Sequence, residues 1–385
     1  MRTPRNVVAS ALASLLWTAC AAGGPVADLS PGQRPALDTD EAGLWMQMDR
    51  IEADLRTSGR VVRDPALNAH VRDIVCRLAP EHCRFVRVYV VQAADFNASM
   101  APNGAMSVWT GLLLRVENDA QLAYLLGHEL AHYLRRHSVQ RWRAMHASTD
   151  AATAFSMVTA VAGVGLVGVA AQLATLDGIF AFSRDQEREA DLIGFEMMVD
   201  AGYDPRQAAA VWRALIAELE VAEEGAQPIF FASHPAAEER LEALAARADA
   251  MPAPQGRASH DRHDAVTEPY RAAWLRDELR QRDFARAQVL LRRLIDRGGD
   301  LGDLYYFEGE LYRLRGDEGD DAKAADAYEA ALETGTAPPE TYRSLGLVYW
   351  SVGRLDDARL AFEDYLRARP DADDRLMVEA YLQQF

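Results

Sequence analysis

The sequence predicts a mainly α-helical protein with a small β-sheet, in which an α+β domain precedes a set of α-helical repeats. Apolar residues recur at helical spacing along most of the chain, and only short runs such as 85–91 and 105–110 have the pattern of strands. Aromatic residues, glycine and alanine recur in repeats after residue 270. With 385 residues, of which 49% are hydrophobic, the chain is long enough for two or three domains.

The charge balance excludes some classes of partner. The formal net charge is −17 at pH 7, whereas a protein that binds nucleic acid needs a basic face for the phosphates. The same charge disfavours attraction to anionic lipid head groups. We therefore expect no nucleic-acid partner, and at most a peripheral association with a membrane.

The first residues are typical of a signal peptide. Arg2 and Arg5 form a basic segment, and the apolar stretch 7–17 that follows is too short for a stable membrane span. We predict that residues 1–20 direct export of the chain to the periplasm.

Two processing sites are compatible with the small residues at the end of this segment. Cleavage before Cys20, with lipid on that cysteine, would make the chain a lipoprotein. In that case Ala21 carries no signal for retention at the inner membrane, so the lipid would anchor the chain to the outer membrane. The alternative is simple cleavage after Ala21 or Ala22.

The other two cysteines support export. Cys76 lies near the end of a predicted helix over 65–79, and Cys83 lies just before the predicted strand over 85–91. An oxidising compartment would allow a disulfide that joins the helix to the strand. The alternative, a zinc site through Cys76, His82 and Cys83, would require adjacent histidine and cysteine ligands, which suit tetrahedral geometry poorly.

The stretch 128–132 reads H-E-L-A-H and has the form H-E-x-x-H. Asn118 predicts the N-cap of the helix that carries it, so His128 and His132 lie one turn apart on one face. Two imidazoles at this spacing can hold one Zn²⁺, and Glu129 is placed to take a proton from water. The alternative is a buried helix that carries these residues by chance.

A third ligand is predicted on a later helix. Ser183 and Gln186 form a capping box at its start. Glu187 and Asp191 lie four residues apart on one face, so Glu187 can bind the metal while Asp191 accepts a hydrogen bond from a ligating histidine. Glu189 points away from Glu187, and we interpret it as a solvated charge, with the alternative that it is the ligand.

H-E-L-A-H followed by S-R-D-Q-E-R-E-A-D resembles the zinc endopeptidase family that includes HtpX, the CAAX prenyl endopeptidases and BepA. The resemblance covers residues 40–250, and it implies an α+β zincin-type peptidase domain with one zinc ion per chain. It places the third zinc ligand at Glu187 and the aspartate of the family's E-x-x-x-D motif at Asp191. The order of signal peptide, peptidase domain and helical repeats is closest to BepA-like proteins.

Two further segments carry the resemblance. Residues 233–235 read S-H-P, with Arg240 five residues after the proline. Residues 97–104, which precede the strand over 105–110, resemble the substrate-side edge strand of the family. We therefore expect an extended substrate to lie against the strand near residues 107–109.

His234 has three interpretations. It is an ordinary histidine at a helix start, a group at the cleft rim that hydrogen-bonds the oxyanion, or a switch that reaches the open zinc position and blocks water. The last resembles the self-inhibition of BepA-like proteins. We expect Arg240 to pair with a carboxylate near the site, and His137 and His146 to be solvated.

The stretch 151–176 has no charged residue and is long enough to span a bilayer. One crossing would place the two zinc histidines and Glu187 on opposite sides of the membrane, and two crossings need roughly forty residues. We therefore expect a buried hairpin, an interfacial element or a flap near the cleft.

Proline, glycine and polar residues over 251–269 predict a linker. Residues 270–385 resemble tetratricopeptide repeats, which expose a concave surface for a client or partner protein, with a plain helical cap as the alternative. The best-matched repeat carries Tyr342, Leu345, Gly346, Tyr349, Ala358, Phe362 and Pro370.

These features together predict an exported zinc metalloendopeptidase with Glu129 as general base. Its expected substrates are misfolded or unassembled envelope proteins, and its repeats could contact outer-membrane assembly proteins. The alternative is an assembly factor or chaperone-like scaffold that acts mainly through its repeats.

Overall fold

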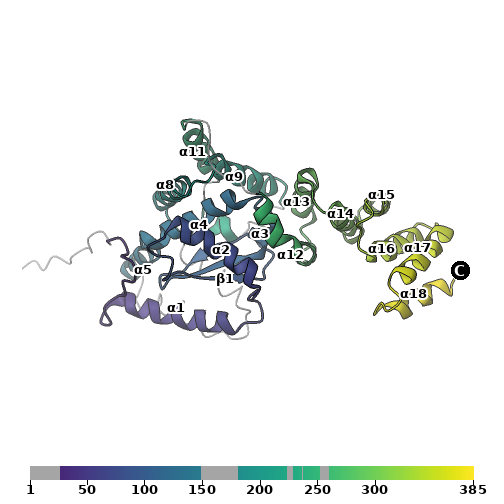
Figure 1. Cartoon of the computed structure of the whole chain (residues 1–385), viewed down its shortest axis with the longest axis horizontal. Coiled ribbons are helices and arrows are strands. Elements are labelled where there is room, and N and C mark those ends of the chain that lie inside the picture. The colour runs from purple at the N-terminus through teal and green to yellow at the C-terminus, as the bar shows by residue number, and fades with distance from the viewer. Residues whose placement is uncertain (1–26, 149–180, 223–228, 236, 252–259) are drawn as a thin grey trace, which may run out of the picture.

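A computed structural model describes residues 27–148, 181–222, 229–235, 237–251 and 260–385. The protein is mainly helical with one small sheet, as predicted. Figure 1 shows a compact N-terminal part built around the sheet and a row of helices that extends from it to the C-terminus. The predicted signal peptide with Cys20 and the apolar stretch 151–176 lie outside the described residues. Among the helices that are described, none is both long and apolar enough to cross a membrane.

The sheet has three strands in the order β1-β3-β2. β1 (Arg87–Val91) runs parallel to the central strand β3 (Ala105–Trp109), and β2 (Ala98–Met100) runs antiparallel to β3. The prediction that a substrate pairs with residues 107–109 is therefore wrong, because β3 already has hydrogen-bonded neighbours on both sides. Within the described residues, β2 is the strand at that edge of the sheet.

Helix α1 (Asp40–Thr57) lies along the sheet (Figure 1). Its apolar face packs with Val91 and Trp109 in a small second core. Glu52 of α1 accepts hydrogen bonds from Arg87, at 2.6 Å for Nη2, and from the hydroxyl of Tyr89, at 2.7 Å. Partly buried hydrogen bonds thus hold α1 against β1.

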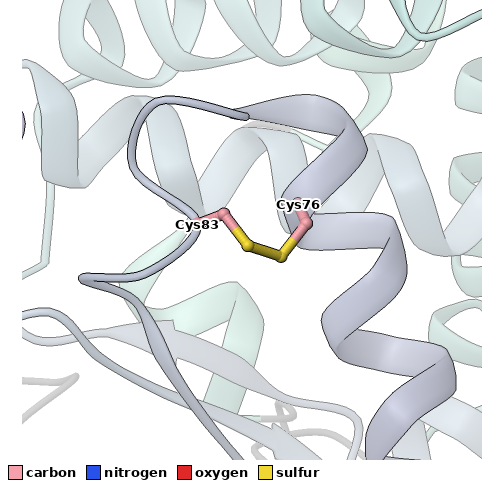
Figure 2. Close-up of a disulfide and its surroundings, with 2 residues drawn as sticks. All are labelled: Cys76 and Cys83. Atoms are coloured by element: carbon pink, nitrogen blue, oxygen red, sulfur yellow. A yellow bond between two sulfur atoms is a disulfide. The ribbon is translucent and has the colours of Figure 1, made fainter.

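Helix α2 (Pro65–Leu78) begins at its predicted N-cap, Asp64, whose side chain accepts a hydrogen bond from the Leu67 amide. Figure 2 shows the disulfide that joins Cys76, near the end of α2, to Cys83 in the loop before β1. The predicted disulfide is therefore present.

The peptidase-type motifs lie on two helices that cross closely. α3 (Thr110–Arg115) leads into α4 (Asp119–Leu134), which Asn118 caps as predicted, and α5 (His137–Ser148) follows. α8 (Arg184–Asp200) begins with the predicted capping box of Ser183 and Gln186. Three further helices follow: α9 (Arg206–Leu219), which packs on α4, α10 (Ile229–Ser233), and α11 (Ala237–Asp249), which packs on α9 and α8.

The predicted linker over 251–269 is partly wrong. Residues 260–269 form the first half of α12 (His260–Arg280), a continuous helix that contains Pro269. The polar pattern of this segment was misleading because His263 and Thr267 are buried against the N-terminal part, and Arg262 pairs with Asp73 of α2 at 2.7 Å.

The remaining helices lie in a row that leads to the C-terminus, and each packs against its neighbours in the chain (Figure 1). Gly309 lies against the Tyr328 ring, and Gly346 lies against the Phe362 ring; in each case an added Cβ would come within 3 Å of the ring. Small residues thus let the paired helices approach, as the repeat interpretation expects. The helices are α13 (Phe284–Arg297), α14 (Leu301–Arg315), α15 (Asp320–Glu333), α16 (Glu340–Ser351), α17 (Leu355–Ala368) and α18 (Arg375–Leu382).

Candidate metal centre

The two histidines of the H-E-x-x-H motif face the same point. Both are buried on α4, and the Nε2 atoms of His128 and His132 lie 3.1 Å apart. Glu129 points to the neighbouring cleft, with Oε1 3.6 Å from Nε2 of His234. The helical spacing therefore places two imidazole nitrogens and one carboxylate as the motif predicts.

Glu187 of α8 joins the two histidines. Its carboxylate oxygens lie 3.4 Å from His132 Nε2 and 3.5 Å from His128 Nε2. His234 adds Nδ1 at 3.2 Å from His128 Nε2 and 3.0 Å from Glu187. Zinc–ligand bonds of 2.0–2.1 Å in a tetrahedron require ligand atoms about 3.3 Å apart. The spacing of these four buried donors therefore fits a zinc ion.

Burial and charge hold His128, His132 and Glu187 in the protonation states that bind metal. Burial lowers the pKa of His128 to about 4, and burial also holds the pKa of His132 well below its usual value. Burial would raise the pKa of Glu187, but the facing His234 and Arg240 outweigh it and keep that pKa well below 4.5. Burial would lower the pKa of His234 as well, but the facing Glu187 outweighs it and raises that pKa. At pH 7 the two motif histidines are neutral and the carboxylate is ionised.

A series of hydrogen bonds fixes His128 on the side of its ring that faces away from the metal position. Nδ1 of His128 lies 3.0 Å from Asp191 Oδ1, as the sequence predicts for the second carboxylate on α8. The Tyr124 hydroxyl donates to the same oxygen at 2.6 Å, and Trp212 Nε1 donates to that hydroxyl at 3.1 Å. Such outer partners fix the orientation of a ligating ring.

Arg240 binds two carboxylates of α8, those of Glu187 and Asp191. Its Nε donates to Asp191 Oδ2 at 2.7 Å, and Nη1 lies 2.8 Å from Glu187 Oε2. The guanidinium also stacks over Trp212, 4.2 Å from the ring centroid. The sequence suggested an ion pair for Arg240, but the roles of Tyr124 and Trp212 were missed. Tyr124 lies one turn before His128 on the same helix face, which is a signal that could have indicated it.

The prediction that His137 is solvated is wrong. This residue is fully buried, with Nδ1 2.9 Å from His132 Nδ1 and Nε2 3.0 Å from Glu189 Oε2. Glu189 also pairs with Arg135, so it is a half-exposed partner of the outer histidine rather than a free surface charge. The chain turns sharply at Arg136, where φ is 57°, and this turn carries His137 back to His132. The side chain of His146 lies outside the described residues.

Two aromatic rings enclose the cluster. Phe182 stacks on His132 with ring centroids 3.8 Å apart, and Phe230 stacks on His234 with centroids 4.5 Å apart. The backbone amide of Phe182 also donates to the Ser233 carbonyl at 3.2 Å. Neither phenylalanine was predicted, because both lie outside the metal motifs and only the fold brings them to the histidines.

A cleft leads to the cluster. Helix α1 and the sheet form its mainly apolar walls, and Glu129 and His234 lie at its inner end. The apolar lining includes Met48, Ile51, Leu55 and Met100. Such a cleft suits an extended chain with apolar side chains.

Two histidines and a glutamate on one helix, a carboxylate from a later helix and an adjoining cleft define a metallopeptidase domain. The model of Peptidase family M48 matches residues 62–248. This part of the chain belongs to that family, whose members are metal-dependent.

The chain resembles named members of two groups. It is 27% identical over 232 residues to the "Putative beta-barrel assembly-enhancing protease" of Vibrio cholerae, with 56% of this chain and 47% of the relative covered. The beta-barrel assembly-enhancing protease of Escherichia coli K12 is 26% identical over 260 residues, with 64% and 53% covered. The mitochondrial metalloendopeptidase OMA1 of Bos taurus is 30% identical over 163 residues, with 41% and 31% covered. The chain thus spans about half the length of the bacterial relatives.

Proposed function

We propose that this chain is a zinc-dependent metalloendopeptidase. His128, His132 and Glu187 would hold the zinc ion. The observation that carries the proposal is the near-tetrahedral spacing of buried donors on α4, α8 and the segment at 234. When bound there, zinc supplies Lewis-acid polarisation of a carbonyl and activation of water.

The residues around the centre have separate tasks in this mechanism. Glu129 takes the proton of the attacking water and then delivers it to the leaving amine. Asp191 accepts a hydrogen bond from Nδ1–H of His128, which keeps the Nε2 lone pair directed at the metal position. Arg240 neutralises part of the charge of Glu187 and Asp191.

We propose that His234 inhibits the enzyme at rest. Its Nδ1 lies among the other three donors, at the place where a catalytic centre keeps a position open for water. The oxyanion role requires the ring to point toward the cleft instead. Phe230 stacks on the ring and favours the inward orientation.

We propose that substrates are misfolded or unassembled envelope proteins in the periplasm. A chain segment in extended form could pair with the edge strand β2, whose Ser99 and Met100 line the cleft. Binding by strand pairing depends on main-chain groups more than on side chains, and so it suits unfolded proteins. The bacterial relatives are named as beta-barrel assembly-enhancing proteases, and these names are in line with such substrates. In this proposal the chain is exported and carries lipid on Cys20.

A second candidate function is an envelope assembly factor. The stacked helix pairs from α12 to α18 extend away from the peptidase part and offer surface for a partner protein. Both functions can reside in one chain.

The Glu129→Gln substitution tests the peptidase proposal. We expect the variant to bind zinc as the wild type does and to lose roughly 100-fold or more of its cleavage of an unfolded casein-type substrate. Glu196→Gln, on the exposed face of α8, is the matched control and should cleave normally. Full cleavage by a folded, zinc-loaded Glu129→Gln protein would refute the mechanism. Rescue of envelope assembly in cells by that variant would favour the scaffold role.

A further inference from the structure

A second group of buried metal-ligand side chains lies outside the catalytic centre. His70 of α2, Asp119 at the start of α4 and His263 of α12 are each at most 3% exposed. One donor atom from each lies within 4.8 Å of the others. Asp119 and His128 are nine residues apart on α4, which separates them by roughly 13 Å along the helix axis. The two groups are therefore distinct.

The polar atoms of this second group have few partners among the described residues. His70 Nε2 lies 3.3 Å from Asp119 Oδ1, but without hydrogen-bond geometry. Both ring nitrogens of His70, Asp119 Oδ1 and His263 Nδ1 have no hydrogen-bond partner there. A buried polar atom left in this state destabilises the fold. Four such atoms at one place require an explanation.

The orientation of His263 is that of a metal ligand. Its Nε2 lies 3.1 Å from the carbonyl oxygen of Leu113. A carbonyl can only accept, so Nε2 carries the proton and Nδ1 keeps its lone pair toward His70 and Asp119. Histidines that bind metal usually donate their other N–H to a carbonyl or carboxylate in this way.

The local charges are compatible with a cation. Burial lowers the pKa of His70 to about 3 and that of His263 to about 4, so both rings are neutral at pH 7. Burial raises the pKa of Asp119, while nearby Arg262 and Arg77 lower it. Arg262 is itself paired with Asp73 at 2.7 Å. Arg271 and Arg297, which act on His263, both pair with Asp264, at 3.3 Å and 2.9 Å. These pairs reduce the repulsion of a metal ion.

We propose that His70, Asp119 and His263 form a second, structural site for a divalent transition-metal ion of the zinc class. Two imidazoles and one carboxylate are ligands that zinc prefers, and a water can complete such a set. Each ligand comes from a different helix. His263 belongs to α12, the helix that leads into the repeats, so the ion would fasten that helix to α2 and α4.

Metal binding to the full chain without its catalytic ligands tests this site. The His128→Ala/His132→Ala protein is dialysed against micromolar Zn²⁺, and the bound metal is measured by elemental analysis. Co²⁺ replaces zinc in a second sample for its visible absorption spectrum. We expect about one ion per chain and a rise in Tm on adding zinc. A folded double variant that retains no ion would overturn the proposal, whatever the catalytic centre does.

Further substitutions in the double variant locate the ion. Adding His263→Gln or Asp119→Asn should abolish the bound ion and the zinc-dependent rise in Tm. Adding His82→Gln, at another buried histidine of the same domain, should leave both unchanged. Loss of the ion with His82→Gln and its retention with a folded Asp119→Asn variant would contradict the assignment. Asp119→Asn preserves size, so it remains informative if His263→Gln does not fold.

Discussion

Gly194 of α8 lies directly against the backbone of Gly127 in α4. A Cβ added to Gly194 would fall 2.9 Å from the carbonyl carbon of Gly127 and 2.6 Å from the amide nitrogen of His128. The two helices can therefore approach closely only without a side chain at this position. The contact sets the distance between the histidines of α4 and the carboxylates of α8.

The Gly194→Ala substitution should consequently impair the metal centre. The added methyl group meets backbone that has little freedom to move, so we expect a loss of stability of about 1–3 kcal/mol. We also expect lower zinc content and lower peptide cleavage, because α8 is displaced from α4. Gly43→Ala in α1 is the matched control, since its Cβ meets open space, and it should be neutral or stabilising. Normal zinc content in Gly194→Ala would show that the crossing tolerates a side chain.

The His234→Ala substitution should raise cleavage several-fold when zinc is saturating. Removal of Nδ1 takes away the fourth donor, so a water and a substrate carbonyl can reach the centre without displacing it. The measurement is kcat/KM on an unfolded protein, with zinc content determined in parallel. His82→Ala, elsewhere in the domain, should leave cleavage unchanged. Abolished cleavage in a zinc-loaded His234→Ala protein would instead assign the ring to the oxyanion.

The Arg115→Met substitution should loosen the repeats from the peptidase domain. Arg115 is 2% exposed and donates to Glu218 of α9 at 2.7 Å and to Glu278 of α12 at 2.5 Å. The variant leaves the buried Glu278 without its cation and removes one of the two cations of Glu218, which keeps Arg293 at 3.3 Å. Such a loss costs about 3–5 kcal/mol. We expect a lower Tm and faster proteolysis between α11 and α13.

Arg280→Met is the control for this experiment. Arg280 pairs with Asp277 on the same helix, but its side chain is 69% exposed. Exposed pairs contribute little, so we expect a change within about 0.5 kcal/mol. Equal effects of the two substitutions would mean that the buried pair does not join the two parts.

Lowering the pH should destabilise the repeats, because the carboxylate of Glu310 becomes protonated. Burial would raise the pKa of this carboxyl, but hydrogen bonds from Arg313, Ser344 and Tyr328 outweigh it and hold the pKa below 4.5. The carboxylate therefore stabilises the fold fully above pH 4.5, and this stabilisation disappears as the pH falls through the lower folded-state pKa.

The Glu310→Gln variant should show a weaker loss of stability than the wild type as the pH falls below 4.5. At pH 7 it should be less stable by about 2 kcal/mol, because charged hydrogen bonds are replaced by neutral ones. Thermal unfolding followed by circular dichroism measures both effects. Glu318→Gln, at an exposed position in the α14–α15 turn, should follow the wild type at every pH. Parallel pH curves for wild type and Glu310→Gln would contradict the role of Glu310.

Features that depend on neighbours in the chain were predicted from the sequence alone. The N-caps Asp64, Asn118 and Ser183 are where the patterns indicate, since a cap binds an amide two or three residues away. The spacing of His128 and His132 determines their common face for the same reason. The helix pairs after α12 also follow from their repeating small and aromatic residues.

Only the tertiary structure decided which distant groups meet. His137 turns inward because Arg136 adopts a left-handed conformation, β2 rather than β3 lies at the sheet edge, and α12 begins inside the expected linker. His70 and His263 are separated by most of the peptidase domain, yet they meet in its interior. Such contacts arise from packing between helices and strands that are distant in the chain. The free energy of this packing depends on the whole fold, so the contacts produce no periodic pattern in the sequence.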